Sequence, residues 1–186
     1  MSEHTDDAHD PQRHPELLVW LAERQAAFEH WARTNGGAER WDFGPASLEP
    51  LEELVRERFG TLEDVFGARR GEFVQGAVWY LGETVRRARG LVWKYEPMIL
   101  DETAPAPRLF APVHQNGTVD TPCVSPAGAD ESAGQYPLNM LCRLLMKHDE
   151  IGAPLEYHLV EALEEPDDDF EDFEGDEDHE DDEDSA

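Results

Sequence analysis

The chain has 186 residues and a formal net charge of −28, from 43 acidic and 15 basic side chains. Residues 161–186 hold 17 of the acidic side chains and neither Lys nor Arg, whereas residues 17–160 hold 21 acidic and 14 basic ones, a net charge of −7. So few basic residues argue against direct binding of nucleic acid phosphates or anionic membranes. No run approaches the ~20 apolar residues that cross a bilayer, and Met1 to His14 lacks an apolar signal region, so we expect a cytoplasmic protein.

The first half of the chain is predicted to form a series of helices. Apolar residues at three-to-four-residue spacing predict a helix from Pro15 that ends at residues 35–37, Asn-Gly-Gly. Ser47 is the expected N-cap of a second helix, which Gly60 ends. Residues 61–64 resemble a capping box with Asp in the Glu position, and predict a short helical turn.

The third helix is the clearest and is expected from Glu72 to Ala88. Its wide apolar stripe indicates a central, mostly buried helix. Gly76 and Gly82 interrupt it, and each costs about 1 kcal/mol relative to Ala in a helix interior. We therefore expect another part of the chain to pack closely against these glycines. Trp79 lies between the valines and the polar side and is expected to be partly exposed.

After this helix the pattern changes to alternation, which predicts a small antiparallel sheet. We expect strands over Leu91–Tyr95, Arg108–His114 and Thr118–Thr121, the last two joined by an Asn-Gly hairpin at residues 115–117. Residues 122–135, rich in Pro, Gly, Ser and Ala, are expected to form a long surface loop.

A last helix is expected from Pro137 to His148, and residues 155–163 fit either a short helix, which we favour, or a strand. N-terminal helices, a small antiparallel sheet with a hairpin and a C-terminal helix make an α+β fold with segregated elements. Because strands and helices do not alternate, and no glycine-rich phosphate loop follows a strand, nucleotide-binding α/β folds are disfavoured.

These elements divide the chain into three parts. Residues 1–14 are expected to form a disordered arm, residues 15–163 a single α+β domain, and residues 164–186 a disordered acidic tail.

The run Tyr80-Leu81-Gly82-Glu83, followed by Arg86-Arg87, Gly90 and Trp93, resembles small uncharacterised bacterial domains of an actinobacterial kind, in which a Tyr-Leu-Gly-Glu helix leads directly into a strand. The resemblance covers roughly residues 70–148. It implies an α+β domain and no particular reaction. Comparable small acidic bacterial proteins include immunity proteins, an analogy of size and charge.

Glu83, Arg86 and Arg87 share one helix face at spacings i, i+3 and i+4. They form either an ordinary helical ion pair, worth a few tenths of a kcal/mol, or a carboxylate held for acid–base chemistry or partner binding. A pocket is expected between this helix and the sheet. Its candidate residues are Glu83, Arg86, Trp93, Tyr95 and His114.

The sequence predicts no metal site, no other cofactor and no catalytic residue. Cys123, Cys142, His114 and His148 have none of the spacings typical of metal ligands, and no nucleophile signature surrounds either cysteine. Two cysteines indicate reduced thiols rather than a disulfide scaffold.

The acidic tail is the strongest candidate for partner binding. Phe170 and Phe173 lie three residues apart in a segment that consists mostly of acidic residues, and they would share one face of a transient helix. The candidate contact residues are Phe170, Phe173, Asp168, Asp169, Glu171 and Asp172. The surrounding charge would steer the tail toward a basic protein. A purely solubilising tail is the other interpretation.

Three functions follow. The first is a non-catalytic cytosolic protein-binding protein, regulatory or immunity-like, whose acidic tail engages a basic partner. The second is a small enzyme or ligand-binding domain with its pocket near Glu83. The third is a DNA mimic, which the modest charge of residues 17–160 disfavours.

Overall fold

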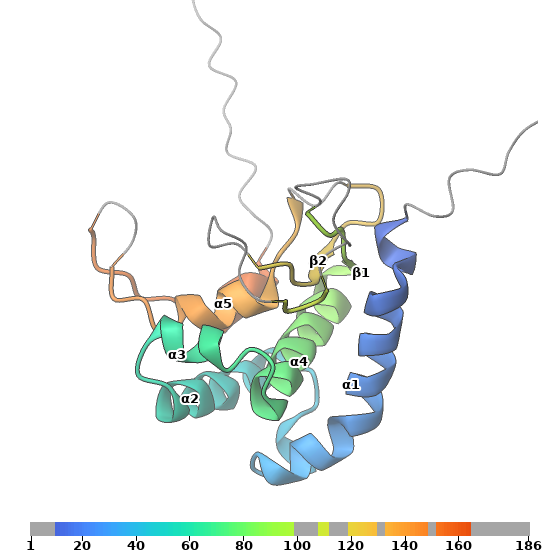
Figure 1. Ribbon diagram of the computed structural model, residues 1–186. Coiled ribbons are helices and arrows are strands. Elements are labelled where there is room, and N and C mark those ends of the chain that lie inside the picture. Colours follow the sequence, from blue (N-terminus) through green and yellow to red (C-terminus); the bar gives the residue numbers. More distant parts are fainter. Residues whose placement is uncertain (1–9, 99–107, 112–118, 130–132, 149–151, 165–186) are drawn as a thin grey trace, which may run out of the picture.

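The computed structural model describes residues 10–98, 108–111, 119–129, 133–148 and 152–164 (Figure 1). The α+β class is confirmed, because helices and a small antiparallel sheet occupy separate parts of the chain. The α-helices are α1 Pro15–Thr34, α2 Leu48–Arg58, α3 Leu62–Gly67, α4 Glu72–Arg89 and α5 Pro137–Arg143. The strands are β1 Val92–Lys94 and β2 Cys123–Ser125, and short 3-10 turns are η2 Pro11–Arg13, η3 Ala38–Arg40, η4 Pro45–Ser47 and η6 Leu159–Leu163.

Residues 10–14 belong to the folded body, although the sequence assigned them to a disordered arm. Asp10 caps η2 by accepting a hydrogen bond from the Gln12 amide (2.9 Å). The Tyr95 amide donates to the Pro11 carbonyl (3.0 Å), which ties this turn to the end of β1. Local polarity did not predict this contact, because its partner is more than eighty residues away in the chain.

The predicted helix boundaries in the first half agree with the structure. α1 ends at its C-cap Asn35, as expected from the two glycines that follow. The Thr61 hydroxyl accepts from the Asp64 amide (3.2 Å), and the Asp64 carboxylate accepts from the Thr61 amide (3.0 Å), so the capping box is confirmed. Ser47 precedes α2, but its hydroxyl accepts from the Tyr80 hydroxyl (2.5 Å) instead of capping the helix.

α4 is the central helix, with α1 on one side of it and α2, α3 and α5 on the other (Figure 1). It ends at Gly90, which adopts the left-handed conformation with φ 67°. The close packing predicted at its glycines is confirmed. A Cβ atom at Gly76 would overlap the Trp31 ring, and one at Gly82 would overlap the Trp93 ring.

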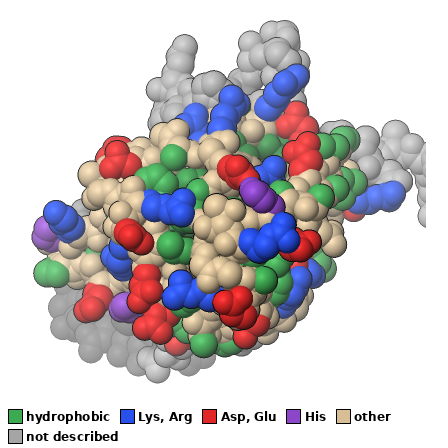
Figure 2. Space-filling model, turned by 90° about the horizontal axis from the view of Figure 1, so that it is seen from below, with side chains coloured by type: hydrophobic (Ala, Val, Ile, Leu, Met, Phe, Trp, Pro, Cys, Tyr) green, Lys and Arg blue, Asp and Glu red, His purple; other side chains and the backbone are tan. Residues whose placement is uncertain are grey.

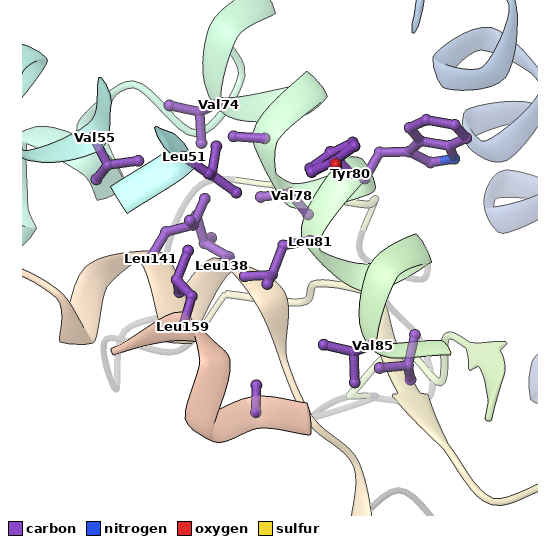
Figure 3. Close-up of a cluster of buried hydrophobic side chains, with 14 of the residues drawn as sticks. Leu51, Val55, Val74, Val78, Tyr80, Leu81, Val85, Leu138, Leu141 and Leu159 are labelled. Carbon is purple, nitrogen blue, oxygen red and sulfur yellow. The ribbon is translucent and has the colours of Figure 1, made fainter. Parts of the chain in front are cut away.

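Aliphatic side chains fill the interior on one side of α4. Figure 3 shows residues of α4 facing α2, α5 and η6 across this cluster. The contributing residues are Val74, Val78, Leu81 and Val85 of α4, Leu51 and Val55 of α2, Leu138 and Leu141 of α5, and Leu159 of η6. Burying aliphatic groups of this size is the main source of favourable folding free energy.

Aromatic side chains fill the opposite side of α4, toward α1. The Phe28 and Tyr80 rings stack with centroids 5.9 Å apart, and Trp31 stacks on Tyr80 at the same separation. Trp79 is buried, with 5% of its surface exposed, because Phe28 and Phe43 pack against its ring. The expectation that Trp79 is partly exposed is therefore wrong.

The sheet differs from the prediction. β1 pairs antiparallel with β2, with Trp93 opposite Val124. β2 lies inside the stretch 122–135 that composition assigned to a surface loop. Its three residues are fully buried, and a three-residue strand buried on both faces has no alternating pattern to detect.

The other predicted strands are absent from the described residues. Residues 108–111 form a turn, and residues 119–121 have no regular structure. The Asn-Gly hairpin at residues 115–117 lies outside the part of the chain that the structure describes.

The C-terminal elements are shorter than expected. α5 ends at Arg143 instead of continuing to His148, because its last turn tightens through i→i+3 bonds such as that from the Leu145 amide to the Cys142 carbonyl (3.0 Å). Residues 155–158 are not helical, and the helix favoured for this stretch is the 3-10 turn η6. Of the predicted acidic tail, only Glu164 is described.

Candidate functional site

A hollow of about 590 Å³ lies between α1, β1 and the C-terminal half of α4. We call it the arginine hollow. Its aromatic and apolar wall consists of Leu21, Phe28, Phe43, Trp79, Val92 and Trp93, and its polar residues are Gln12, Gln25, Glu83, Arg86 and Arg87. The hollow thus combines an apolar wall with a carboxylate and two guanidinium groups.

Gly82 allows the central contact of this site to form. Because position 82 has no side chain, the Trp93 ring of β1 packs against the α4 backbone. In that position the indole Nε1 donates a hydrogen bond to Glu83 Oε1 (2.8 Å). The glycine that weakens the helix locally therefore permits a strand residue to bind the next residue of the helix.

Glu83 is a buried carboxylate held by three side chains. Arg86 binds it through two nitrogens, Nε to Oε1 (2.9 Å) and Nη2 to Oε2 (3.0 Å). Arg87 Nε donates to Oε2 (3.2 Å). With the indole of Trp93, each carboxylate oxygen accepts two hydrogen bonds, and the Glu83 side chain is only 8% exposed.

This environment keeps Glu83 ionised. Burial raises the pKa of Glu83, but the hydrogen bonds from Arg86 and Trp93 and the charges of Arg86 and Arg87 outweigh burial, so the pKa lies below its ordinary value. The same hydrogen bond raises the pKa of Arg86. A carboxylate that is already ionised and fully engaged is suited to positioning arginines rather than to transferring protons.

The two arginines keep donor groups that do not bind Glu83. The Arg87 guanidinium lies over the Phe43 ring, 3.6 Å from its centroid, which fixes the plane of the group. The side chains of Arg86 and Arg87 are 36% and 46% exposed. Within the described residues, their nitrogens other than those bound to Glu83 donate no hydrogen bond. Among the described residues that line the hollow, one carboxylate and two guanidinium groups give a net charge of +1.

Three of the five predicted pocket residues, Glu83, Arg86 and Trp93, come together in the hollow. Tyr95 is buried beside His14, with ring centroids 4.8 Å apart, and does not line the hollow. His114 lies outside the described residues, as do the tail candidates Phe170, Phe173, Asp168, Asp169, Glu171 and Asp172.

Sequence reasoning did not assign Gln12, Gln25, Phe28 or Phe43 to the site. Phe43 lies in a connector with φ 61°, a left-handed conformation that is uncommon outside glycine. No periodicity predicts this geometry, and only the fold of the connector brings the ring to Arg87. A signal was available for Arg87, which shares the helix face of Glu83 and Arg86.

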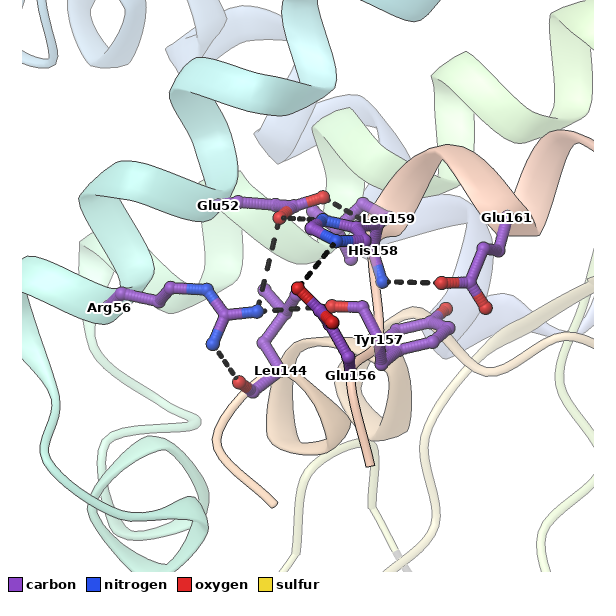
Figure 4. A network of polar contacts seen from close by, with 8 residues as sticks. All are labelled: Glu52, Arg56, Leu144, Glu156, Tyr157, His158, Leu159 and Glu161. Carbon is purple, nitrogen blue, oxygen red and sulfur yellow. Dashed lines mark hydrogen bonds and ion pairs between the residues drawn. The ribbon is translucent and has the colours of Figure 1, made fainter. Parts of the chain in front are cut away.

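A second polar cluster joins α2 to the C-terminal segment (Figure 4). Glu52 accepts from the Leu159 amide (2.6 Å) and contacts His158 Nδ1 (3.1 Å). Arg56 donates to the carbonyls of Leu144 and Tyr157. Because most of these partners are backbone groups, the cluster serves to fix η6 to the body.

One face of the molecule can be compared with what DNA mimicry requires. On the face seen in Figure 2, acidic side chains are interspersed with Lys and Arg. A mimic of DNA needs carboxylates ordered at phosphate-like spacing, which this face does not offer.

No described group of three or more His, Cys, Asp or Glu side chains is arranged to hold a metal ion.

Neither cysteine forms a disulfide, and burial together with the charge of Glu63 raises the pKa of the Cys142 thiol to about 11. In the described part of the chain, every helix is too short or too polar to cross a membrane.

No family model, curated protein or solved structure matches this chain. The resemblance to small bacterial domains therefore stays a prediction, and the candidate site rests on its own geometry.

Proposed function

We propose that this chain is a non-catalytic binding protein that recognises an acidic peptide segment carrying an aromatic side chain, and that the arginine hollow is the recognition site. The observation that carries this proposal is the pair of guanidiniums held by the buried carboxylate of Glu83 beside an aromatic wall. Arginine pairs with carboxylates through planar, two-point hydrogen bonds.

The chemistry of the hollow supports binding over proton transfer. Glu83, the one carboxylate among the described lining residues, accepts four hydrogen bonds and has a lowered pKa. Among its described lining residues there is no Ser, Cys, Lys or His to act as a nucleophile or base. Hydrophobic walls with a few fixed polar groups are typical of binding sites.

Each half of the proposed ligand has a counterpart in the hollow. A ligand carboxylate would take the remaining N–H groups of Arg87 and Arg86. An aromatic ring next to it in sequence would pack on the partly exposed part of the wall, formed by Leu21 and Phe28.

The test is fluorescence anisotropy with a labelled peptide, acetyl-Asp-Asp-Phe-Asp-Asp-amide, at two salt concentrations. We expect Arg87→Gln to weaken binding about tenfold, the size of one lost charged hydrogen bond. Arg33→Gln is the matched control, because Arg33 is an exposed arginine paired with Glu29 on α1. Equal binding of peptides with Asn in place of Asp, or Ala in place of Phe, contradicts the proposal.

The acidic tail supports a second binding role, directed at a basic partner. Residues 161–186 carry 17 acidic side chains without a basic one, and Phe170 and Phe173 lie among them. Such a segment is attracted to basic surfaces through long-range electrostatics. Capture of partners from a lysate at low salt by the full chain and by residues 1–165 tests this role. Equal recovery by both forms contradicts it.

A further inference from the structure

We infer that the segment Asp168–Phe173 of the chain's own tail occupies the arginine hollow and thereby regulates access to it. This inference rests on the proposed function, since it names an acidic, aromatic segment that meets the same binding chemistry. It concerns how the site is controlled rather than whether the site binds.

The composition of the tail matches the hollow. The segment places Phe170 and Phe173 next to four carboxylates, those of Asp168, Asp169, Glu171 and Asp172. The hollow offers aromatic rings and two partly exposed guanidiniums. Either phenylalanine can pack on the aromatic wall while a neighbouring carboxylate pairs with Arg87.

The tail starts at η6, which packs on the opposite side of α4 from the hollow. The Glu52 and Arg56 contacts fix residues 157–159 to the body, as Figure 4 shows. When the Gln135 amide is oriented to satisfy both neighbours, its nitrogen donates to the Ala162 carbonyl (3.1 Å) and its oxygen accepts from Arg89. Ala162 is thus linked through one side chain to Arg89, so the tail starts at the same end of α4 as Arg87 but on a different face of the helix.

The length of the tail is sufficient for the segment to cross α4. Six residues from Glu164 to Phe170 span up to about 20 Å when extended. A path around half the circumference of an α-helix, whose diameter with side chains is about 10–12 Å, is about 16–19 Å long. A tether this short holds its end at an effective concentration on the order of millimolar, so even a weak contact would be well populated.

Tail docking would couple the two proposed binding roles. A basic partner that binds the tail would remove it from Arg86 and Arg87, and this would open the hollow to an acidic ligand. Linkage requires the converse as well, because an acidic ligand in the hollow would release the tail.

The first test compares binding of the labelled acidic peptide to the unchanged full chain and to the full chain carrying Phe170→Ala and Phe173→Ala. We expect the double variant to bind the peptide about tenfold more tightly, because its own tail no longer competes. Equal affinities overturn the inference and leave the proposed function intact. Failure of both chains to bind the peptide overturns the proposed function itself.

The second test traps the tail chemically. Gln25→Cys on the rim of the hollow is combined with Glu171→Cys in the full chain and oxidised with glutathione disulfide. We expect an intramolecular disulfide to form at least tenfold faster than in the matched pair with Glu57→Cys, an exposed position on α2. Equal rates overturn the inference. Covalent dimers as the main product also overturn it, because they show that the tail docks on a second copy.

Discussion

The two sides of α4 differ in the chemistry of the side chains that pack against them. Toward α2, α5 and η6, aliphatic side chains such as Leu81 and Leu138 are fully buried and carry no polar group. Toward α1, aromatic rings are buried with indole and hydroxyl groups that need partners, and a hollow remains at the C-terminal end. Apolar packing accounts for the aliphatic side. The aromatic side adds a hollow with charged groups, and the proposed binding function is assigned to that side.

Replacing one leucine by alanine on each side of α4 should give the largest difference in stability between the two sides. Leu81→Ala removes a fully buried side chain and should lower the free energy of unfolding by about 3 kcal/mol. Leu21→Ala removes a half-buried wall of the hollow and should cost less than about 1.5 kcal/mol, because water already reaches the site. Urea denaturation measures both values. Equal costs would show that the two sides are packed alike.

Adding one methyl group at Gly82 should disturb the aromatic side. Gly82→Ala places a Cβ atom in the space of the Trp93 ring, so we expect a loss of about 1–3 kcal/mol in stability despite the better helix propensity of Ala. Peptide binding should weaken as well, because Trp93 no longer reaches Glu83. Gly67→Ala is the control, since no atom lies within 4 Å of a Cβ atom there, and it should be neutral or slightly stabilising. Equal effects at the two positions would argue against a packing role for Gly82.

The charge of Glu83 should make the aromatic side sensitive to pH. A carboxyl group whose pKa is lowered in the folded chain stabilises the fold above its ordinary value of 4.5, and that stabilisation is lost as the pH falls through the lowered pKa. Glu83→Gln should therefore cost about 1–3 kcal/mol at pH 7. The difference between the two chains should shrink toward pH 3. A difference that stays constant over this range of pH would mean that the Glu83 charge is not the stabilising feature.

The last prediction concerns the rate of a chemical modification and not the stability of the fold. Cys142 is partly buried, and burial together with the charge of Glu63 raises the pKa of its thiol to about 11. At pH 8 a disulfide reagent should modify it roughly two orders of magnitude more slowly than an exposed thiol of ordinary pKa. Denaturant should restore the ordinary rate. Rapid modification of the native chain would show that this side of the molecule opens readily.

The sequence by itself determined the elements whose signals are local. The ends of α1 and α4 follow from glycines and caps within a few residues, and the Thr61–Asp64 capping box needs only its own four positions. The common helix face of Glu83, Arg86 and Arg87 follows from the helical repeat. The sequence also predicted that other parts of the chain pack closely against Gly76 and Gly82, because a glycine inside a helix lowers stability unless packing compensates for it.

Only the tertiary structure decided which distant residues meet. Strand β2 is buried and three residues long, so no alternation marked it. Tyr95 and Trp93 are two residues apart, yet only Trp93 reaches Glu83. Phe43 meets Arg87 through a connector in a left-handed conformation, and Gln12 reaches the hollow through a turn assigned to a disordered arm. These contacts depend on the packing of the whole chain, which fixes relative positions that no local pattern encodes.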